Sequence, residues 1–360
     1  MTSGPDHTAN AINRLWPEVI ASPELHLHQL DVVQQAGLFV QMPAGAYRTA
    51  SFLDGRSFSA ETLAGWIPFH VVRDTVLSGP TPATPLNFIF HMGHTGSTLL
   101  SRLLDETGAV QPLREPLVLR DLAAMHDHRE DPASLVAPQD LDAWDEIMLR
   151  LWARCREGQQ CAVLKATSNA ARIASALMTA RPFARAVYLS MARQPYLAVI
   201  LAGPASLMDV RGHAQERMRR LIKILGPPDF PLHALSPGEL VALSWVVEAL
   251  TREHLRTAVG DRLLTLDFDH FLEDMPASMA AVLAHFGLPG GTELADRIAR
   301  SPTLGQYAKA PEHAYSSQLR ADVIRRSMQH NRTEIARGLA LLDSLGKEHG
   351  RVAELLNDRG

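Results

Sequence analysis

From residue 86 onward, short runs of apolar residues alternate with longer amphipathic segments. The apolar runs have the length of strands and occur at residues 86–91, 109–112, 161–165, 184–191 and 263–268. Four segments between them repeat apolar residues at helical spacing, at residues 97–106, 141–156, 168–179 and 237–259. This alternation predicts an α/β fold in which helices connect the strands of a mainly parallel central sheet.

The two ends of the chain have different patterns. Residues 1–84 show no clear period and end in a run rich in proline and threonine, residues 78–85, that sustains neither helix nor strand. A further helix is predicted at residues 278–286, because its apolar spacing stops at Gly287 with Pro289 beyond. Residues 316–356 have the pattern of helices. The sequence therefore predicts an N-terminal extension (1–84) of unknown role and one α/β domain with a helical C-terminus (85–360).

Charge and cysteine content narrow the function classes. The chain has 35 Lys and Arg against 39 Asp and Glu, a net charge of −4, which argues against an extended basic face for nucleic acid. Cys155 and Cys161 are its two cysteines, too few for a disulfide framework, so a reducing cytoplasm is expected. The N-terminus lacks the pattern of a signal peptide. The apolar stretch 240–250 is about half of the roughly 20 residues that a membrane span needs.

The turn between the first predicted strand and helix of the α/β domain has the features of an anion-binding loop. Gly93 and Gly96 let the backbone approach a ligand closely, and the free N–H groups at the start of the helix point toward it. Thr95, Ser97 and Thr98 add hydroxyl groups. A plain strand-to-helix turn capped by Ser and Thr is the alternative. The Walker A spacing and its lysine are absent, which disfavours an ordinary ATPase or GTPase.

This loop resembles the 5′-phosphosulfate loop of sulfotransferases that use 3′-phosphoadenosine 5′-phosphosulfate (PAPS), where a Pro-[Lys/Arg]-Ser-Gly-Thr-Thr-Leu-Leu turn holds the donor. Residues 93–100 occupy that frame as Gly-His-Thr-Gly-Ser-Thr-Leu-Leu. Further similar motifs follow in order at residues 113–116, 163–168, 186–195, 264–268, 286–289 and 307–310. The resemblance is to bacterial sulfotransferases related to the tyrosylprotein-type branch and spans residues 86–325. It implies a P-loop-like three-layer α/β/α fold, PAPS as co-substrate and no metal.

The resemblance also implies a role for each matching residue. Glu115 stands where the family has its general base, and Lys165 ends a strand from which it could reach the transferring sulfonate. Arg193 would hold the 3′-phosphate, while Lys309 and Arg320 lie in a basic segment that could close over the nucleotide. The loop residues implied to bind the donor are Gly93, His94, Thr95, Gly96, Ser97 and Thr98.

Plainer structural roles remain open for these charged residues. Glu115 could be a surface glutamate paired with Arg114 or Arg120. Lys165 could extend from its strand end into solvent. Arg193 could pair with an acid such as Asp209.

The chain departs from the family pattern at two positions. His94 replaces the basic residue of the loop with a titratable cation whose reference pKa is about 6.5, so charge support for the sulfate is expected to depend on pH. Leu201 stands where the family has a serine for the 3′-phosphate, and Ser206 is the nearest substitute. Histidine pairs also occur, without metal-site spacing, so no metal site is predicted; they are His26/His28, His91/His94 and His126/His128.

Together these features predict a PAPS-dependent sulfotransferase that modifies a hydroxyl or amine of a small-molecule, sugar or peptide acceptor. A kinase-like phosphotransferase, dependent on ATP and magnesium, is the alternative enzyme class. A degenerate nucleotide-binding protein is the alternative outside enzymology. The sequence specifies neither the acceptor nor the oligomeric state. Residues 47–53 of the extension could wall the acceptor site or cover a sheet edge, and the second role is favoured.

Overall fold

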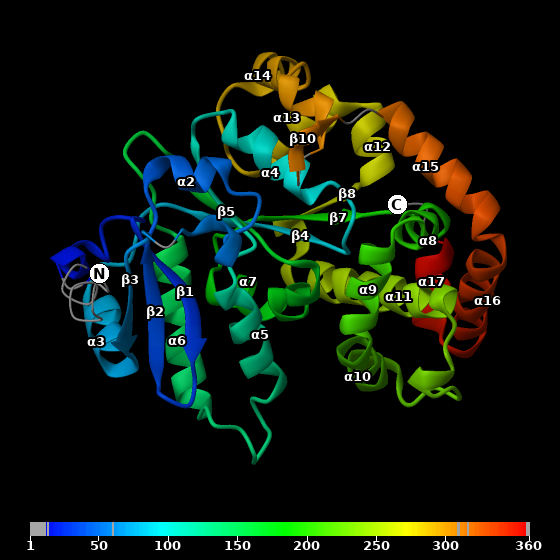
Figure 1. Cartoon of the computed structure of the whole chain (residues 1–360), viewed down its shortest axis with the longest axis horizontal. Helices are drawn as coiled ribbons and strands as arrows, with labels where there is room; N and C mark the ends of the chain where they lie inside the picture. The colour runs from blue at the N-terminus through cyan, green and yellow to red at the C-terminus, as the bar shows by residue number, and fades with distance from the viewer. Residues whose placement is uncertain (1–11, 13, 60, 308–309, 315–316, 358–360) are drawn as a thin grey trace.

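A five-stranded parallel sheet organises the chain (Figure 1). The computed structural model describes residues 12, 14–59, 61–307, 310–314 and 317–357. The sheet consists of β4 (Leu86–His91), β5 (Val110–Arg114), β6 (Cys161–Lys165), β7 (Ala186–Ser190) and β8 (Leu263–Asp267). Their spatial order is β5-β6-β4-β7-β8, and every neighbouring pair is parallel. The predicted α/β fold and all five predicted strands are thus confirmed, with shifts of up to two residues at strand ends.

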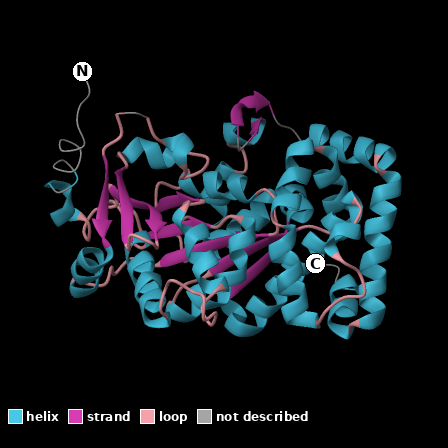
Figure 2. Ribbon diagram, turned by 60° about the horizontal axis from the view of Figure 1, so that its bottom comes forward, coloured by secondary structure: helices cyan, strands magenta, loops and turns pink. Residues whose placement is uncertain are grey.

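Helices cover both faces of the sheet, which gives the three layers that were expected (Figure 2). Every residue of β4 is buried, including the polar Asn87 and His91, so neither face of the strand is exposed to solvent. Phe88 and Phe90 pack in one apolar cluster with helices α5 and α6, whereas Ile89 packs in a second cluster with α4 and α8. The helices concerned are α4 (Ser97–Asp105), α5 (Val118–Asp127), α6 (Pro138–Trp152) and α8 (Arg193–Ala202).

Strand order places the functional edge of the sheet. β4 is central: the chain leaves it for β5 at one edge of the sheet, returns through β6 and then crosses β4 to reach β7 and β8 on the other side. Ligands of open α/β sheets bind at such a switch point, outside the carboxyl ends of the strands. The loop that follows β4, which carries Gly93 and Gly96, lies at this point.

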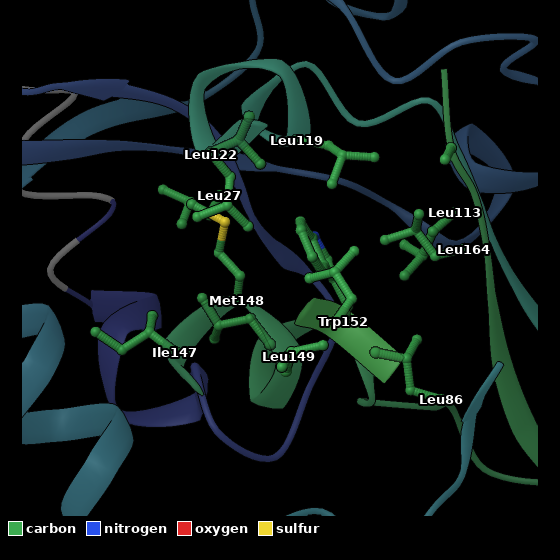
Figure 3. Packing of buried hydrophobic residues seen from close by; sticks show 14 of the residues in the cluster. Leu27, Leu86, Leu113, Leu119, Leu122, Ile147, Met148, Leu149, Trp152 and Leu164 are labelled. Atoms are coloured by element: carbon green, nitrogen blue, oxygen red, sulfur yellow. The ribbon is translucent and has the colours of Figure 1, made fainter. Parts of the chain in front are cut away.

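The N-terminal region is more regular than its sequence pattern predicted. It forms an antiparallel sheet of β1 (Leu25–Asp31), β2 (Ala36–Gln41) and β3 (Ala64–Pro68), with α2 (Ala44–Thr49) and α3 (Phe69–Ser78). The sequence shows no clear period here because His26 and His28 occupy buried positions of β1 among its apolar residues. Figure 3 shows Leu27 of β1 in one cluster with Leu122 of α5 and Met148 of α6.

The N-terminal sheet therefore shares its core with one face of the central sheet. Residues 79–85 join the two as irregular chain, as the predicted linker requires. The division of the chain into 1–84 and 85–360 stays a prediction.

The remaining elements are mostly helical. They are α7 (Ala174–Ala180), α9 (Pro204–Gly212), α10 (Ala214–Leu225), α11 (Pro237–Val259), α12 (Phe268–Glu273), α13 (Met275–His285), α14 (Gly291–Ile298), α15 (Ser317–His330), α16 (Arg332–Glu348) and α17 (Gly350–Asn357), with the short strands β9 (Gln306–Tyr307) and β10 (Ala310–Ala314). The helical C-terminus and α11 are confirmed. The helix predicted at 168–179 is instead a 3-10 helix over Ser168–Ile173 followed by α7. No helix in the described ranges is long and apolar enough to cross a bilayer.

The buried histidine of β1 predicts acid sensitivity. Burial, followed by the charges of His28 and Arg154, lowers the pKa of His26 to about 3. In the unfolded chain His26 binds a proton near pH 6.5, whereas in the folded chain it stays neutral down to about pH 3. Between these pH values protonation favours the unfolded chain, so the free energy of unfolding falls as the pH falls from about 6.5 toward 3. We expect the free energy of unfolding to drop by about 2 kcal/mol between pH 7 and pH 5 through this residue.

Urea denaturation of the wild type and of His26→Leu at the two pH values measures this contribution. The variant should lose most of the drop, whereas His70→Leu, at an exposed position of α3, should keep it. An equal drop in His26→Leu and wild type would contradict the assignment.

Candidate active site

The carboxyl ends of the five strands bring together most of the residues singled out in the sequence. The loop at residues 92–96 follows β4, Glu115 follows β5, and Lys165 is the last residue of β6. Met191 follows β7, and Phe268 follows β8 at the start of α12. Because parallel strands end at the same edge, segments separated by up to about 180 positions in the sequence meet there.

The loop after β4 has the backbone conformation of an anion cradle. Gly93, His94 and Gly96 have φ angles of 92°, 56° and 71°, all in the left-handed region. Left-handed residues turn successive N–H groups toward one point, which makes a concave site for negative charge. Gly96 also precedes α4, so the N–H groups of the first helical turn add the positive end of the helix dipole. The geometry suits a phosphate or a sulfonate.

Hydrogen bonds hold this loop in place from two sides. His91 at the end of β4 accepts the Gly93 N–H at Nδ1 (3.0 Å), so its proton is on Nε2, which donates to the Ala166 carbonyl at 2.9 Å. The Tyr196 hydroxyl donates to the Met92 carbonyl at 3.0 Å. His91 and Tyr196 are supports that the sequence analysis missed. A tyrosine one turn into the helix after β7 carries no distinctive sequence signal for this task.

The three hydroxyl residues of the loop do different things. Thr95 is fully buried and donates to the Leu189 carbonyl of β7 at 3.3 Å, so its hydroxyl supports the sheet edge. Ser97 and Thr98 are buried in the first turn of α4. Within the described residues, the buried Oγ1 of Thr98 has no hydrogen-bond partner. A buried hydroxyl without a partner is costly, and an oxyanion in the loop would supply one.

Glu115 and Lys165 form a direct ion pair at this edge. Nζ of Lys165 contacts Oε1 of Glu115, and the two side chains are only 0% and 10% exposed. Nη2 of Arg120 lies 3.9 Å from the other carboxylate oxygen. Glu115 also has a left-handed φ of 50°, which is unusual for a residue with a side chain and concentrates at functional sites.

The geometry of this pair excludes two of the plainer structural roles for Glu115 and Lys165. Lys165 does not extend into solvent, because its side chain is buried. Arg114 does not pair with Glu115; its guanidinium binds Asp105 at 3.1 Å. The structure therefore brings Glu115 and Lys165 together at the sheet edge, and their roles as base and cation stay a prediction.

Arg193 lies at the start of α8, directly after β7. Its Nη1 forms an ion pair with Asp343 of α16 at 3.0 Å, instead of the expected alternative partner Asp209. Leu201 packs with apolar residues, and Ser206 lies in the first turn of α9. Lys309 lies outside the described residues.

Arg320 reaches the same edge from α15. It pairs with Asp269 and lies over the ring of Phe268, with its guanidinium carbon 5.0 Å from the ring centroid. Phe268 itself abuts the loop, because a Cβ at Gly96 would overlap its ring. The C-terminal helix α15 thus contacts the anion loop through one aromatic side chain.

Metal ligands do not gather at this site. The described residues contain no group of three or more His, Cys, Asp or Glu side chains that could hold a metal ion.

Comparison with known proteins finds that this chain is similar to several solved structures. No family model and no curated protein matches the chain. A sulfotransferase from Alicyclobacillus acidocaldarius matches with a TM-score of 0.38 and 12% identity, over 73% of this chain and 96% of that one. The sulfotransferase domain from the curacin biosynthetic pathway matches with a TM-score of 0.35 and 12% identity, over 69% of this chain and 97% of that one.

Retinol dehydratase, solved with androsterone and the inactive cofactor PAP, matches with a TM-score of 0.32 and 11% identity. That match covers 88% of this chain and 96% of the other. These three solved structures are thus two sulfotransferase structures and retinol dehydratase. The narrower likeness to the tyrosylprotein-type branch stays a prediction.

Proposed function

We propose that this protein is a PAPS-dependent sulfotransferase. The observation that carries the proposal is the buried Lys165–Glu115 pair at the sheet edge that also holds the left-handed loop and the partnerless hydroxyl of Thr98. A carboxylate, a mobile ammonium and an oxyanion cradle are the groups that sulfuryl transfer needs, because the reaction moves a negatively charged group onto an acceptor oxygen or nitrogen.

The chain's own residues fit the donor. Gly93, His94, Gly96 and the first turn of α4 would hold its sulfated 5′ end, and Thr98 would donate its buried hydroxyl to an oxygen there. Arg193 would hold the 3′-phosphate by exchanging its exposed ion pair with Asp343 for a phosphate contact. Lys309 is proposed to add a second cation.

The proposed reaction forms one bond and breaks one. The acceptor oxygen or nitrogen attacks sulfur, and the bond between sulfur and the bridging phosphate oxygen breaks with its electron pair left on the departing 3′-phosphoadenosine 5′-phosphate (PAP). Glu115 takes the acceptor's proton. Lys165 offsets the charge that develops on the bridging oxygen. Since Lys165 and Glu115 contact each other directly, bound substrates must draw them apart.

Calorimetric titration with PAP tests the proposal without knowledge of the acceptor. We expect micromolar binding, weaker binding of ATP with magnesium, and about a tenfold loss of PAP affinity in Thr98→Val and in Arg193→Ala, or about 1.4 kcal/mol. Arg129→Ala is the matched control, since Arg129, in the connection after α5, pairs with Asp142 of α6 in a similarly exposed ion pair.

Other outcomes would decide against the proposal. Magnesium-dependent ATP binding without a response to PAP would favour the phosphotransferase. Binding of neither nucleotide would favour a degenerate scaffold.

A pair of glycine variants separates the shape of the loop from general backbone strain. Gly96 and Gly108 have similar φ angles of 71° and 73°, but only a Cβ at Gly96 would meet Phe268; one at Gly108 meets nothing within 4 Å. Both alanine variants should lose about 1 kcal/mol of stability from the left-handed backbone. Gly96→Ala alone should also lose at least tenfold in PAP affinity by calorimetry, because its loop must shift. Equal PAP affinity in the two variants would place the ligand elsewhere.

A further inference from the structure

The N-terminal region reaches the candidate active site through residues 46–57. The backbone N–H of Leu53 donates to the Arg114 carbonyl at 2.7 Å, and the Leu117 N–H donates to the Leu53 carbonyl at 3.1 Å. These bonds lie on either side of Glu115 in the sequence. Segment 46–57 is therefore fixed against the strand end that carries the proposed base.

Phe52 of this segment lies over the catalytic cation. The centroid of its ring is 5.5 Å from Nζ of Lys165 and 4.2 Å from the guanidinium carbon of Arg56. Hydrogen bonding to Asp54 raises the pKa of Arg56, and the charge of Glu115 raises it further. Arg56 and Phe52 are thus electrostatic neighbours of the Glu115–Lys165 pair.

A cavity of about 390 Å³ opens beside Phe52. Its lining residues are Ala46, Thr49, Ala50, Ser51, Phe52, Arg56 and Ser57. The lining combines three hydroxyl groups, one aromatic ring and one guanidinium, and it includes no long aliphatic side chain. Asp54 binds Nε and Nη2 of Arg56, which neutralises the cation and leaves Nη1 for a ligand as far as the described residues go.

We propose that this cavity is the acceptor subsite and that it takes a neutral, hydroxyl-rich acceptor of the sugar or polyol class. The inference rests on the proposed sulfotransferase function. Hydroxyl groups and an aromatic ring are suited to a sugar, whose polar edge forms hydrogen bonds and whose apolar face packs on a ring. The neutralised Arg56 disfavours a strongly anionic acceptor, and the lack of aliphatic lining disfavours an apolar alcohol. This assigns residues 46–57 to the acceptor wall in addition to the covering of the β5 sheet edge, the role that the sequence favoured for residues 47–53.

Ligand-observed saturation-transfer NMR on the full chain, saturated with PAP, tests the subsite. The probes are methyl β-D-glucopyranoside and maltose, with 1-octanol as the apolar comparison. We expect saturation transfer to at least one sugar probe and not to 1-octanol, with at least a fivefold loss of the sugar signal in Arg56→Leu. Arg56 is 67% exposed on its side chain, so this variant should fold normally.

Arg73→Leu is the matched control, because Arg73 also lies over a phenyl ring, that of Phe69, and pairs with a neighbouring carboxylate, that of Asp74. It lies on α3, outside the cavity lining, and should keep the full sugar signal. A PAP-bound wild type that binds neither sugar, or an Arg56→Leu variant that matches the control, would overturn the subsite alone. Failure of PAP to bind would overturn the proposed function and the subsite with it.

Discussion

Glu115→Gln is expected to lower the free energy of unfolding by about 3 to 5 kcal/mol, an unusually large effect for a change of one atom type. The cause is Lys165, whose side chain is fully buried and loses the carboxylate that compensates its charge. Removing one member of a buried pair leaves an uncompensated charge in a medium of low polarity. Urea denaturation at pH 7 measures the loss.

The double variant Glu115→Gln/Lys165→Met supplies the control. It removes both charges, so it should recover most of the stability that the single variant loses. Arg120→Gln should cost little, because Arg120 is 47% exposed and lies 3.9 Å from Glu115. A loss below about 1 kcal/mol in Glu115→Gln would mean that water screens the pair.

The same variants separate catalysis from structure. If Glu115 is the base, Glu115→Gln should lower turnover by about 10² to 10⁴ with a measured acceptor, while PAP affinity stays near the wild-type value. A pair with only a structural role would lose stability and keep turnover in the remaining folded protein. Comparing single-turnover rates with unfolding curves therefore distinguishes the two roles.

Local pattern made the centre of the site predictable. The loop at residues 93–98 combines glycines and hydroxyls directly between an apolar strand and an amphipathic helix, and each feature is contained in a few neighbouring residues. Glu115 and Lys165 were placed by the same logic, since strand ends of a parallel sheet converge at one edge. Their side chains meet although 50 positions separate them.

Contacts between distant segments set the rest of the site, and no local pattern reports them. Arg193 meets Asp343 across 150 positions, so its choice of acid over Asp209 depends on how α16 packs. Phe52 reaches Lys165 from a region whose strands were hidden by the buried His26 and His28. The Thr95 hydroxyl donates to a backbone carbonyl of β7, and the geometry of the loop, not the residue type, determines this partner.

Arg114→Met is expected to detach segment 46–57 from the sheet and to cost about 3 to 5 kcal/mol. The Arg114 side chain is only 1% exposed. It donates to the carbonyls of Tyr47, Arg48 and Ala50 at 2.9 to 3.1 Å, and it pairs with Asp105. Its loss leaves three carbonyls without this donor and leaves the Asp105 carboxylate with the more distant Nε of the exposed Arg48, at 3.4 Å. Methionine fills the space without replacing any bond.

Urea denaturation measures the loss in the free energy of unfolding, and hydrogen exchange at residues 46–57 shows whether this segment is the part that is destabilised. Exchange in this segment should rise in Arg114→Met, while the exposed ion-pair variant Arg129→Met should change stability by less than about 1 kcal/mol. PAP affinity should persist in the folded fraction, because the loop after β4 is held by His91 and Tyr196 and not by Arg114. Unchanged exchange in residues 46–57 would mean that the hydrogen bonds of Leu53, with the contacts of Arg48 and Ser51 to α4, are enough to hold the segment. In that case Arg114 supports only α4, and the acceptor wall forms without it.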